Sequence, residues 1–181
     1  SGLEIDKGRG NAIKLLTRTL LALAPLGARL ARIDGGNKRN AIPRDAVALV
    51  FVPKKRLDEA KAVVSAMHDT CRAELSPSVD PTPEIAAAPV KGRCKVLRKG
   101  LQKKLLLTLA GLPHGVVKMS ADIPGLVETS TNLGVITTSK KDIAVSTSQR
   151  SSVASEIVEI AQGVRAVFEL GGATVTGSDG Y

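Results

Sequence analysis

The sequence predicts an α+β fold, a two-layer sandwich whose antiparallel sheet carries helices mainly on one face. Two patterns lead to this prediction. Segments with apolar residues at three- and four-residue spacing alternate with short apolar strands, and a tight turn joins two consecutive strands in the second half of the chain. A chain of 181 residues suits a single domain with one core. Aromatic residues make up only 2%, so this core must be built from aliphatic side chains.

The first half of the chain supplies two helices and two strands. A leucine stripe begins after Asn11, which is the expected N-cap of the first helix. The second strand is apolar on both faces, so we expect it to be covered on both sides or to lie at an interface. The expected elements are a helix over residues 11–28, strands over 29–34 and 46–52, and a helix over 54–75.

The second half mixes helices with short strands. Lys140-Lys141-Asp142 predicts a hairpin turn, and Ser151 or Ser152 is the expected N-cap of the last helix. A basic helix is expected to bury its four-residue leucine repeat, Leu97, Leu101, Leu105 and Leu109. The expected elements are a loop over 76–83, helices over 95–110 and from 151 or 152 to about 170, and strands over 84–90, 126–130, 134–138, 143–148 and 173–176.

Positive charge is concentrated in one segment. The formal net charge is +9, and residues 85–121 contain no acid. The bases of this segment are Lys91, Arg93, Lys95, Arg98, Lys99, Lys103, Lys104 and Lys118. They could bind phosphates or an anionic membrane surface, meet an acidic neighbouring domain, or form a solvated helix face. Nucleic acid is disfavoured because the segment has no stacking aromatic residue and Gln102 is its only amide side chain.

Side chains that could carry chemistry are few. His68 and Cys71 have the spacing of half a zinc site, but no second pair follows, and Cys71 lies on the apolar stripe of its helix. His114 follows a Leu-Pro pair and is expected in a surface turn. No Gly-x-Ser-x-Gly sequence occurs. These residues predict no catalytic residue and no metal site in the chain.

The cysteines and the hydropathy pattern bear on location. Two cysteines make no disulfide framework, which favours a reducing compartment. No apolar run reaches the roughly 18 residues of a membrane span, and the first ten residues contain no apolar signal-peptide centre. We therefore expect a cytoplasmic protein with no membrane partner.

Two polar residues are candidates for binding. Arg150 lies between the end of a strand and the start of a helix, where a cation is unfavourable. Its position is explained if it takes an anion such as a substrate carboxylate, while the alternative is a solvated or acid-paired arginine. Asn40 precedes Ala41-Ile42-Pro43, which is equally compatible with a plain turn.

Four stretches together resemble one family, the aminoacyl-histidine dipeptidases (peptidase D, Xaa-His dipeptidase), within the larger clan of di-zinc exopeptidases. The most specific stretch is Val-Glu-Thr-Ser-x-Asn-Leu-Gly at residues 127–134. The others are Ser1-Gly2 with Ile5 and Gly8-Arg9-Gly10-Asn11-Ala12, then Asp34-Gly35-Gly36 with Asn40-Ala41-Ile42-Pro43-Arg44-Asp45-Ala46, and finally Arg150-Ser151-Ser152. The resemblance extends to Asp179-Gly180-Tyr181 and covers the whole chain.

This resemblance implies that residues 1–181 form a single lid, or dimerisation, domain, ferredoxin-like with insertions and inserted between two halves of a catalytic domain. The zinc ligands and catalytic carboxylates of the family belong to those halves. It follows that this chain has no catalytic or metal residue and is inactive alone, while the parent enzyme holds two zinc ions. The implied partners are the catalytic domain, a second lid domain and a dipeptide.

Two substrate-binding residues carry over from the family. Arg150 matches the arginine that binds the C-terminal carboxylate of the substrate. Asn40 matches an asparagine that reaches the substrate, in related dimers from the partner subunit. The alternative function is a basic module that binds nucleic acid or an anionic surface.

Overall fold

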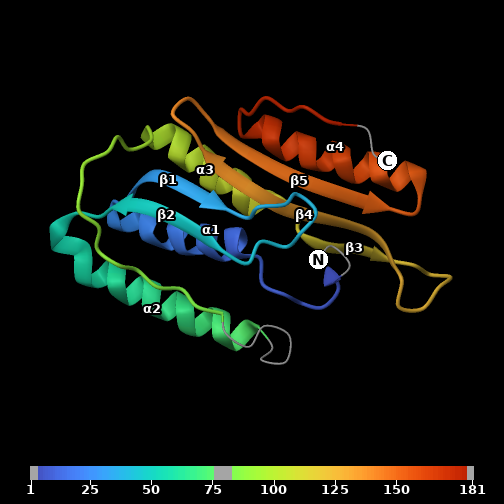
Figure 1. Ribbon diagram of the computed structural model, residues 1–181, viewed down its shortest axis with the longest axis horizontal. Coiled ribbons are helices and arrows are strands. Elements are labelled where there is room, and N and C mark those ends of the chain that lie inside the picture. Colours follow the sequence, from blue (N-terminus) through green and yellow to red (C-terminus); the bar gives the residue numbers. More distant parts are fainter. Residues whose placement is uncertain (1–3, 76–82, 179–181) are drawn as a thin grey trace.

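The computed structural model describes residues 4–75 and 83–178, and its helices and strands form the predicted two-layer α+β sandwich (Figure 1). The helices are α1 (Ala12–Leu23), α2 (Leu57–Glu74), α3 (Lys99–Gly111) and α4 (Ala154–Leu170), with short 3₁₀ turns at Ala24–Leu26 and Lys54–Arg56. The strands are β1 (Arg29–Gly35), β2 (Ala46–Phe51), β3 (Gly115–Met119), β4 (Val127–Thr138) and β5 (Ile143–Ser151).

The sheet is built around β4, and every strand pair in it is antiparallel. One edge of β4 pairs with β5 along most of its length. The other edge is shared by β3, which pairs with the first part of β4, and by β1, which meets β4 at Ile136. β2 pairs with β1 alone and forms one edge of the sheet.

The sequence predicts two strands where the structure has the single strand β4. The register of the β4–β5 pair shifts between Leu133 and Val135, so Gly134 lies at a bulge rather than at a break. Thr131 and Asn132, which lie between the two predicted strands, are both buried and paired with β5. The predicted hairpin turn is confirmed, because the Ser139 amide donates to the Asp142 carbonyl at 2.8 Å.

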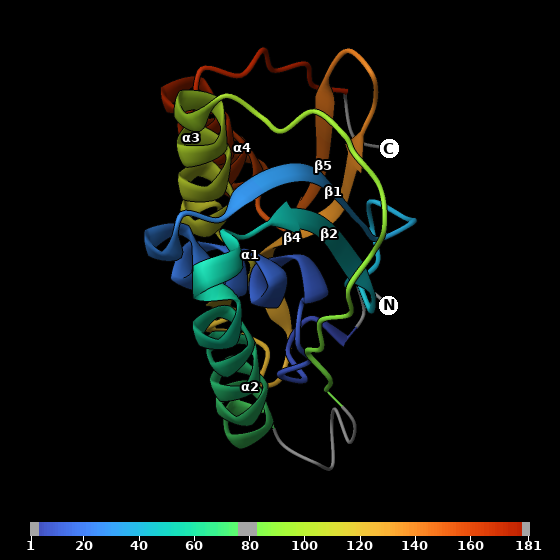
Figure 2. The same ribbon diagram turned by 90° about the vertical axis from the view of Figure 1, so that its left-hand side faces the viewer.

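The core lies between the sheet and three helices. Figure 2 shows α3 and α4 on one side of the strands, and α2 packs against α1 farther out. The main cluster is aliphatic apart from Phe168 and consists of Ile13, Leu20, Leu30, Ile33, Leu106, Leu109, Leu112, Leu133, Ile136, Val164 and Phe168. A smaller cluster of Leu23, Ala28 and Ala60 joins α2 to α1.

The first turn of α1 is tied to both layers. Asn11 is the N-cap as predicted, because its Oδ1 accepts hydrogen bonds from the amides of Ile13 and Lys14. Its Nδ2 also donates to the Leu133 carbonyl on β4 at 2.8 Å. Lys14 caps the C-terminus of α3, since its ammonium donates to three carbonyls, those of Leu109, Ala110 and Leu112.

Two predicted strands are wrong. Residues 84–90 and 173–176 are extended but pair with no strand of the described chain. Their backbones are held by other partners: the Ile85 amide donates to His68 Nδ1 at 3.1 Å, and Arg165 donates to the Val175 carbonyl at 3.3 Å. Within the predicted loop 76–83, residues 76–82 lie outside the described residues.

The expected covering of β2 on both faces is not found among the described residues. Val47 is 66% exposed, so its face of the strand is open to solvent, and β2 is also an edge strand. The alternative, that β2 lies at an interface, stays a prediction.

Two helices differ from expectation at their first turns. α3 begins at Lys99 and buries Gln102, Leu106 and Leu109, while Leu101 is half exposed. α4 begins at Ala154, and Val153 takes the N-cap position without a side-chain bond. The Ser151 hydroxyl instead accepts from the Val153 amide at 3.0 Å, one residue before the helix.

Gln102 explains why the buried face of α3 differs from its leucine repeat. Its Oε1 accepts from the Leu30 amide, and its Nε2 donates to the Ala28 carbonyl, both at 2.9 Å. Burying Gln102 satisfies two backbone groups at the start of β1, which would otherwise lose hydrogen bonds to water. The only amide of the basic segment is therefore occupied by the fold.

The half-buried imidazole of His114 predicts a loss of stability in mild acid. Burial, helped by the nearby Lys14 ammonium, lowers the pKa of His114 from 6.5 to about 4. Between these values the unfolded chain binds a proton that the folded chain does not. The free energy of unfolding should therefore fall as the pH falls from 6.5 to 4, by at most about 1.4 kcal/mol per pH unit from this group.

Urea unfolding at a series of pH values measures this dependence. His114→Gln should flatten the curve above pH 5, where the carboxylates remain ionised. His68→Gln is the matched control, and it should keep the wild-type slope because it leaves His114 in place. Equal slopes in wild type and His114→Gln would show that His114 does not carry the effect.

Candidate functional site

The two candidate binding residues, far apart in the sequence, meet at one small hollow. Asn40 lies in the loop between β1 and β2, and Arg150 lies on β5. The residues that line the hollow are Ile5, Asn40, Ser130, Asn132, Ser148 and Arg150. Leu133 and Val145 point from β4 and β5 into the core, so the alternation of strand side chains places Asn132 and Arg150 on the face away from it.

The position of Asn40 is fixed by a side chain from β4. Asn132 Nδ2 donates to the carbonyls of Arg39 and Ala41, both at 2.9 Å, and so holds the residues on either side of Asn40. Asn132 is only 5% exposed, whereas Asn40 is exposed. The loop backbone is therefore anchored while the Asn40 side chain remains accessible.

Two glycines let this loop lie directly on β4. A Cβ at Gly134 would come within 2.7 Å of Arg39 Cα, which no real side chain tolerates. Gly36 has a φ of +68°, and a Cβ there would overlap the Gly134 carbonyl oxygen. The two glycine-containing stretches of the sequence are therefore the two sides of one close contact.

Arg150 lies opposite Ser130 in the β4–β5 ladder. The sequence placed it beside a helix N-terminus, but α4 begins four residues later, at Ala154. Its side chain is exposed and forms no hydrogen bond or ion pair with any residue that the structure describes. Of the two structural alternatives, the acid-paired arginine is thus not what is observed, and the guanidinium is free to bind an anion.

A polar cluster that the sequence reasoning missed holds the turn after Arg150. The Thr129 hydroxyl bonds the Ser151 hydroxyl at 2.9 Å and donates to the Glu156 carboxylate. Lys118 forms ion pairs with Glu156 and, at 2.6 Å, with Glu128. In the sequence, Lys118 stood out only as one more base of the basic segment.

The ion pairs of this cluster shift the ionisation of their members. Hydrogen bonds to Glu128 and Glu156 raise the pKa of Lys118. Hydrogen bonds from Lys118 and Thr129 lower the pKa of Glu156. Both groups therefore stay charged around neutral pH, and β3, β4 and α4 are joined at the end of β5 that carries Arg150.

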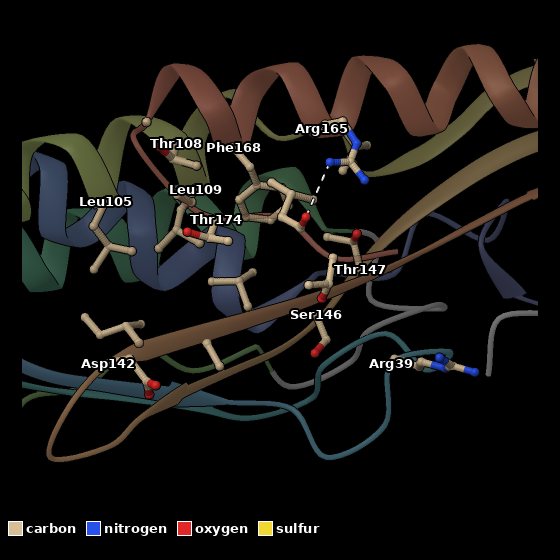
Figure 3. A pocket seen from close by; sticks show the side chains of 18 of the residues that line it. Arg39, Leu105, Thr108, Leu109, Asp142, Ser146, Thr147, Arg165, Phe168 and Thr174 are labelled. Carbon is tan, nitrogen blue, oxygen red and sulfur yellow. Dashed lines mark hydrogen bonds between the residues drawn. The ribbon is translucent and has the colours of Figure 1, made fainter. Parts of the chain in front are cut away.

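A wide groove runs between β5, α3 and α4 (Figure 3). Its walls combine apolar side chains such as Leu105, Leu109 and Phe168 with hydroxyls such as Ser146 and Thr147. Residues 171–178 run along it, held by the bond from Arg165 to the Val175 carbonyl shown in Figure 3. Asn40, Ser148 and Arg150 line both this groove and the small hollow, so the two candidate binding residues are accessible from the groove as well.

No metal site forms in the described part of the chain. His68 Nδ1 accepts from the Ile85 amide, and Cys71 is 1% exposed in the packing of α2. No group of three or more His, Cys, Asp or Glu side chains among the described residues could hold a metal ion.

His114 is half-buried beside Asn11 rather than in a surface turn, which corrects the sequence expectation.

Comparison with known proteins finds similarity to the dimerisation domains of peptidases. The family model described as the peptidase dimerisation domain matches residues 1–79. The cytosol non-specific dipeptidase of Escherichia coli (strain K12) is 31% identical over 182 residues, which cover 100% of this chain and 37% of that protein. The aminoacylhistidine dipeptidase of Vibrio alginolyticus has a crystal structure that matches with a TM-score of 0.90 and 33% identity over 94% of this chain. In sequence and fold, this chain is therefore similar to the dimerisation domain of such dipeptidases.

The match confirms the resemblance seen in the sequence, and it concerns only part of the relatives. The chain spans 37% of the Escherichia coli protein and 35% of the Vibrio alginolyticus chain. No helix among the described residues has the length and hydropathy needed to cross a membrane. The alternative of a basic binding module gains no support, because the amide of Gln102 is buried and Lys118 is ion-paired.

The close contact between the loop and β4 predicts the effect of one added methyl group. Gly134→Ala should lower the free energy of unfolding by about 2–4 kcal/mol, because the new Cβ meets the backbone of Arg39, which cannot move aside as a side chain can. The amides of residues 39–41 should also exchange faster with solvent. Urea unfolding and hydrogen exchange measure the two effects.

Gly163→Ala provides the matched control. Gly163 lies in the middle of α4, and a Cβ there has no atom within 4 Å. Alanine should therefore stabilise the chain by about 0.5–1 kcal/mol through its higher helix propensity. Equal effects of the two substitutions would mean that the loop does not depend on the space at Gly134.

Proposed function

We propose that residues 1–181 form the lid and dimerisation domain of a zinc-dependent cytoplasmic dipeptidase, inserted between two halves of its catalytic domain. The observation that carries this proposal is the hollow in which Asn40 and an unpaired Arg150 come together on a dimerisation-domain fold. In the parent enzyme, two zinc ions held by the catalytic halves would polarise the scissile carbonyl. The isolated chain would then bind and orient substrate without hydrolysing it.

Arg150 is the residue proposed to bind the C-terminal carboxylate of the dipeptide. A guanidinium presents paired N–H donors that match the two oxygens of a carboxylate. The side chain stands free on a strand whose end is fixed by the Thr129, Ser151 and Glu156 cluster. A cation on a rigid strand holds the substrate in one orientation, which is the contribution that a lid makes to catalysis.

Asn40 is proposed to contact the substrate from the anchored loop. Its amide can both donate and accept, which suits a peptide group. Because Asn132 holds the backbone on either side, the side chain of Asn40 starts from a fixed position. In related dimers the corresponding asparagine reaches the site of the partner subunit, and the same arrangement is proposed here.

The open edge of β2 is the proposed pairing surface. An edge strand presents free amides and carbonyls that can continue a sheet into a second copy. Val47 is 66% exposed there and Phe51 is 36% exposed. The apolar helix that follows Asn11 is a second candidate in the sequence, but α1 is covered by α2 and α3, and its residues Ile13, Leu20 and Leu23 are buried in the core clusters.

Arg150→Ala in the full-length enzyme should lower kcat/KM for dipeptides by about 30- to 1000-fold. This corresponds to about 2–4 kcal/mol of transition-state stabilisation for a desolvated carboxylate contact. Arg72→Ala on the exposed side of α2 is the control and should change nothing. Dipeptide kinetics that are the same in Arg150→Ala and wild type would refute the assignment.

Val47→Glu should weaken self-association of the 181-residue chain, because it places a charge on the exposed face of the pairing strand. Sedimentation velocity over a concentration series should show dimers in wild type and a shift to monomers in the variant. Leu170→Glu is the control, since Leu170 is 86% exposed at the end of α4, away from β2. Wild-type monomers at every concentration, or dimers that persist in Val47→Glu, would exclude pairing through β2.

A further inference from the structure

The amide oxygen of Asn132 is a buried acceptor that the fold does not use. Its Nδ2 donates to two carbonyl oxygens. Rotating the amide by half a turn would place Oδ1 next to these two oxygens, where no hydrogen bond can form. The orientation of the amide is therefore determined, and Oδ1 points away from the loop. It has no hydrogen-bond partner among the described residues although Asn132 is 95% buried. A buried acceptor left without a partner is unusual in a folded protein.

This oxygen belongs to the hollow that contains Arg150. In the β4–β5 ladder, Asn132 lies opposite Ser148 and Arg150 lies opposite Ser130. Asn132 and Arg150 are therefore diagonal neighbours on one face, roughly 7 Å apart at the backbone. Ser130 and Ser148 line the same hollow, but neither hydroxyl satisfies Oδ1. The unpaired acceptor Asn132 Oδ1 thus lies beside the Arg150 guanidinium, which has no anionic partner among the described residues.

We infer that Asn132 Oδ1 accepts a hydrogen bond from the backbone N–H of the same substrate residue whose carboxylate Arg150 binds. The inference rests on the proposed function, which supplies the carboxylate. In a C-terminal residue the N–H and the carboxylate are attached to one Cα, so an acceptor next to a guanidinium can meet both groups. Asn132 and Arg150 together recognise the backbone N–H and the carboxylate of an N-acyl α-amino acid, and neither residue recognises its side chain.

Asn132 then has two separate roles. Its Nδ2 positions the loop of Asn40, and its Oδ1 binds the ligand. A single amide therefore links the loop to the bound peptide. A ligand that lacks the N–H would leave a buried oxygen unpaired, and sites built in this way reject such analogues strongly.

Competitive inhibition of the full-length enzyme tests the inference with matched ligands. N-acetyl-L-alanine and O-acetyl-L-lactate differ only in the replacement of the N–H by oxygen. Wild type should bind the first about 10- to 100-fold more tightly than the second. N-acetyl-L-alanine methylamide lacks the carboxylate and tests Arg150 separately. It should bind more weakly than N-acetyl-L-alanine to wild type, and this difference should disappear when Arg150 is replaced.

The variants separate ligand binding from loop positioning. Asn132→Ala should reduce the preference for the N–H ligand to less than about threefold. Gly134→Ala disturbs the same loop without changing Oδ1, and it should weaken both ligands while keeping the wild-type preference. The wild-type comparison remains decisive if a variant fails to fold.

The possible results are distinguishable. Equal binding of the amide and ester ligands to wild type would overturn the role of Asn132, even if the carboxylate preference shows that Arg150 acts as proposed. A preference for the N–H ligand that survives in Asn132→Ala would also overturn it. Loss of the carboxylate preference in wild type would instead overturn the proposed function and remove the basis of the inference.

Discussion

The site depends on the direct contact between the β1–β2 loop and the middle of β4. Gly36 and Gly134 remove the side chains that would hold the two backbones apart. Asn132 then holds the loop against β4 through two hydrogen bonds to its backbone carbonyls. Because β4 also pairs with β5, the same strand sets the distance from the loop to Arg150. One central strand therefore brings both candidate binding residues to a common hollow.

The sequence predicted the four helices and the strands β1, β2 and β5, because apolar periodicity reports burial directly. It predicted no strand at β3, whose residues are mostly exposed. It failed in β4, which was predicted as two strands although the polar residues between them, Thr131 and Asn132, are buried and paired. It also failed at residues 84–90 and 173–176, whose backbones bond to His68 and Arg165 instead of a strand. Local patterns contain no information on such distant partners.

The candidate site was predictable only in part for the same reason. The position of Arg150 suggested an anion, and the resemblance to dipeptidases supplied the roles of Arg150 and Asn40. That the two residues share a hollow follows from the β4–β5 register and the loop contact, neither of which is local in sequence. Asn132 entered the sequence analysis only as part of the motif at residues 127–134, because its hydrogen bonds to the loop join residues about ninety positions apart.

The arrangement separates stability from binding across the sheet. The face that carries α1, α3 and α4 holds the aliphatic core, whereas the hollow on the other face holds an unpaired guanidinium and an unpaired amide oxygen. Leaving the buried Asn132 oxygen without a partner costs stability that the core must supply, whereas the exposed Arg150 guanidinium is solvated. In return, neither group needs to break an internal bond or reorient when a peptide arrives, since β4 and β5 already hold them. Rigid strands therefore suit this task better than mobile loops, and a side chain that satisfied either group internally would weaken recognition even as it stabilised the fold.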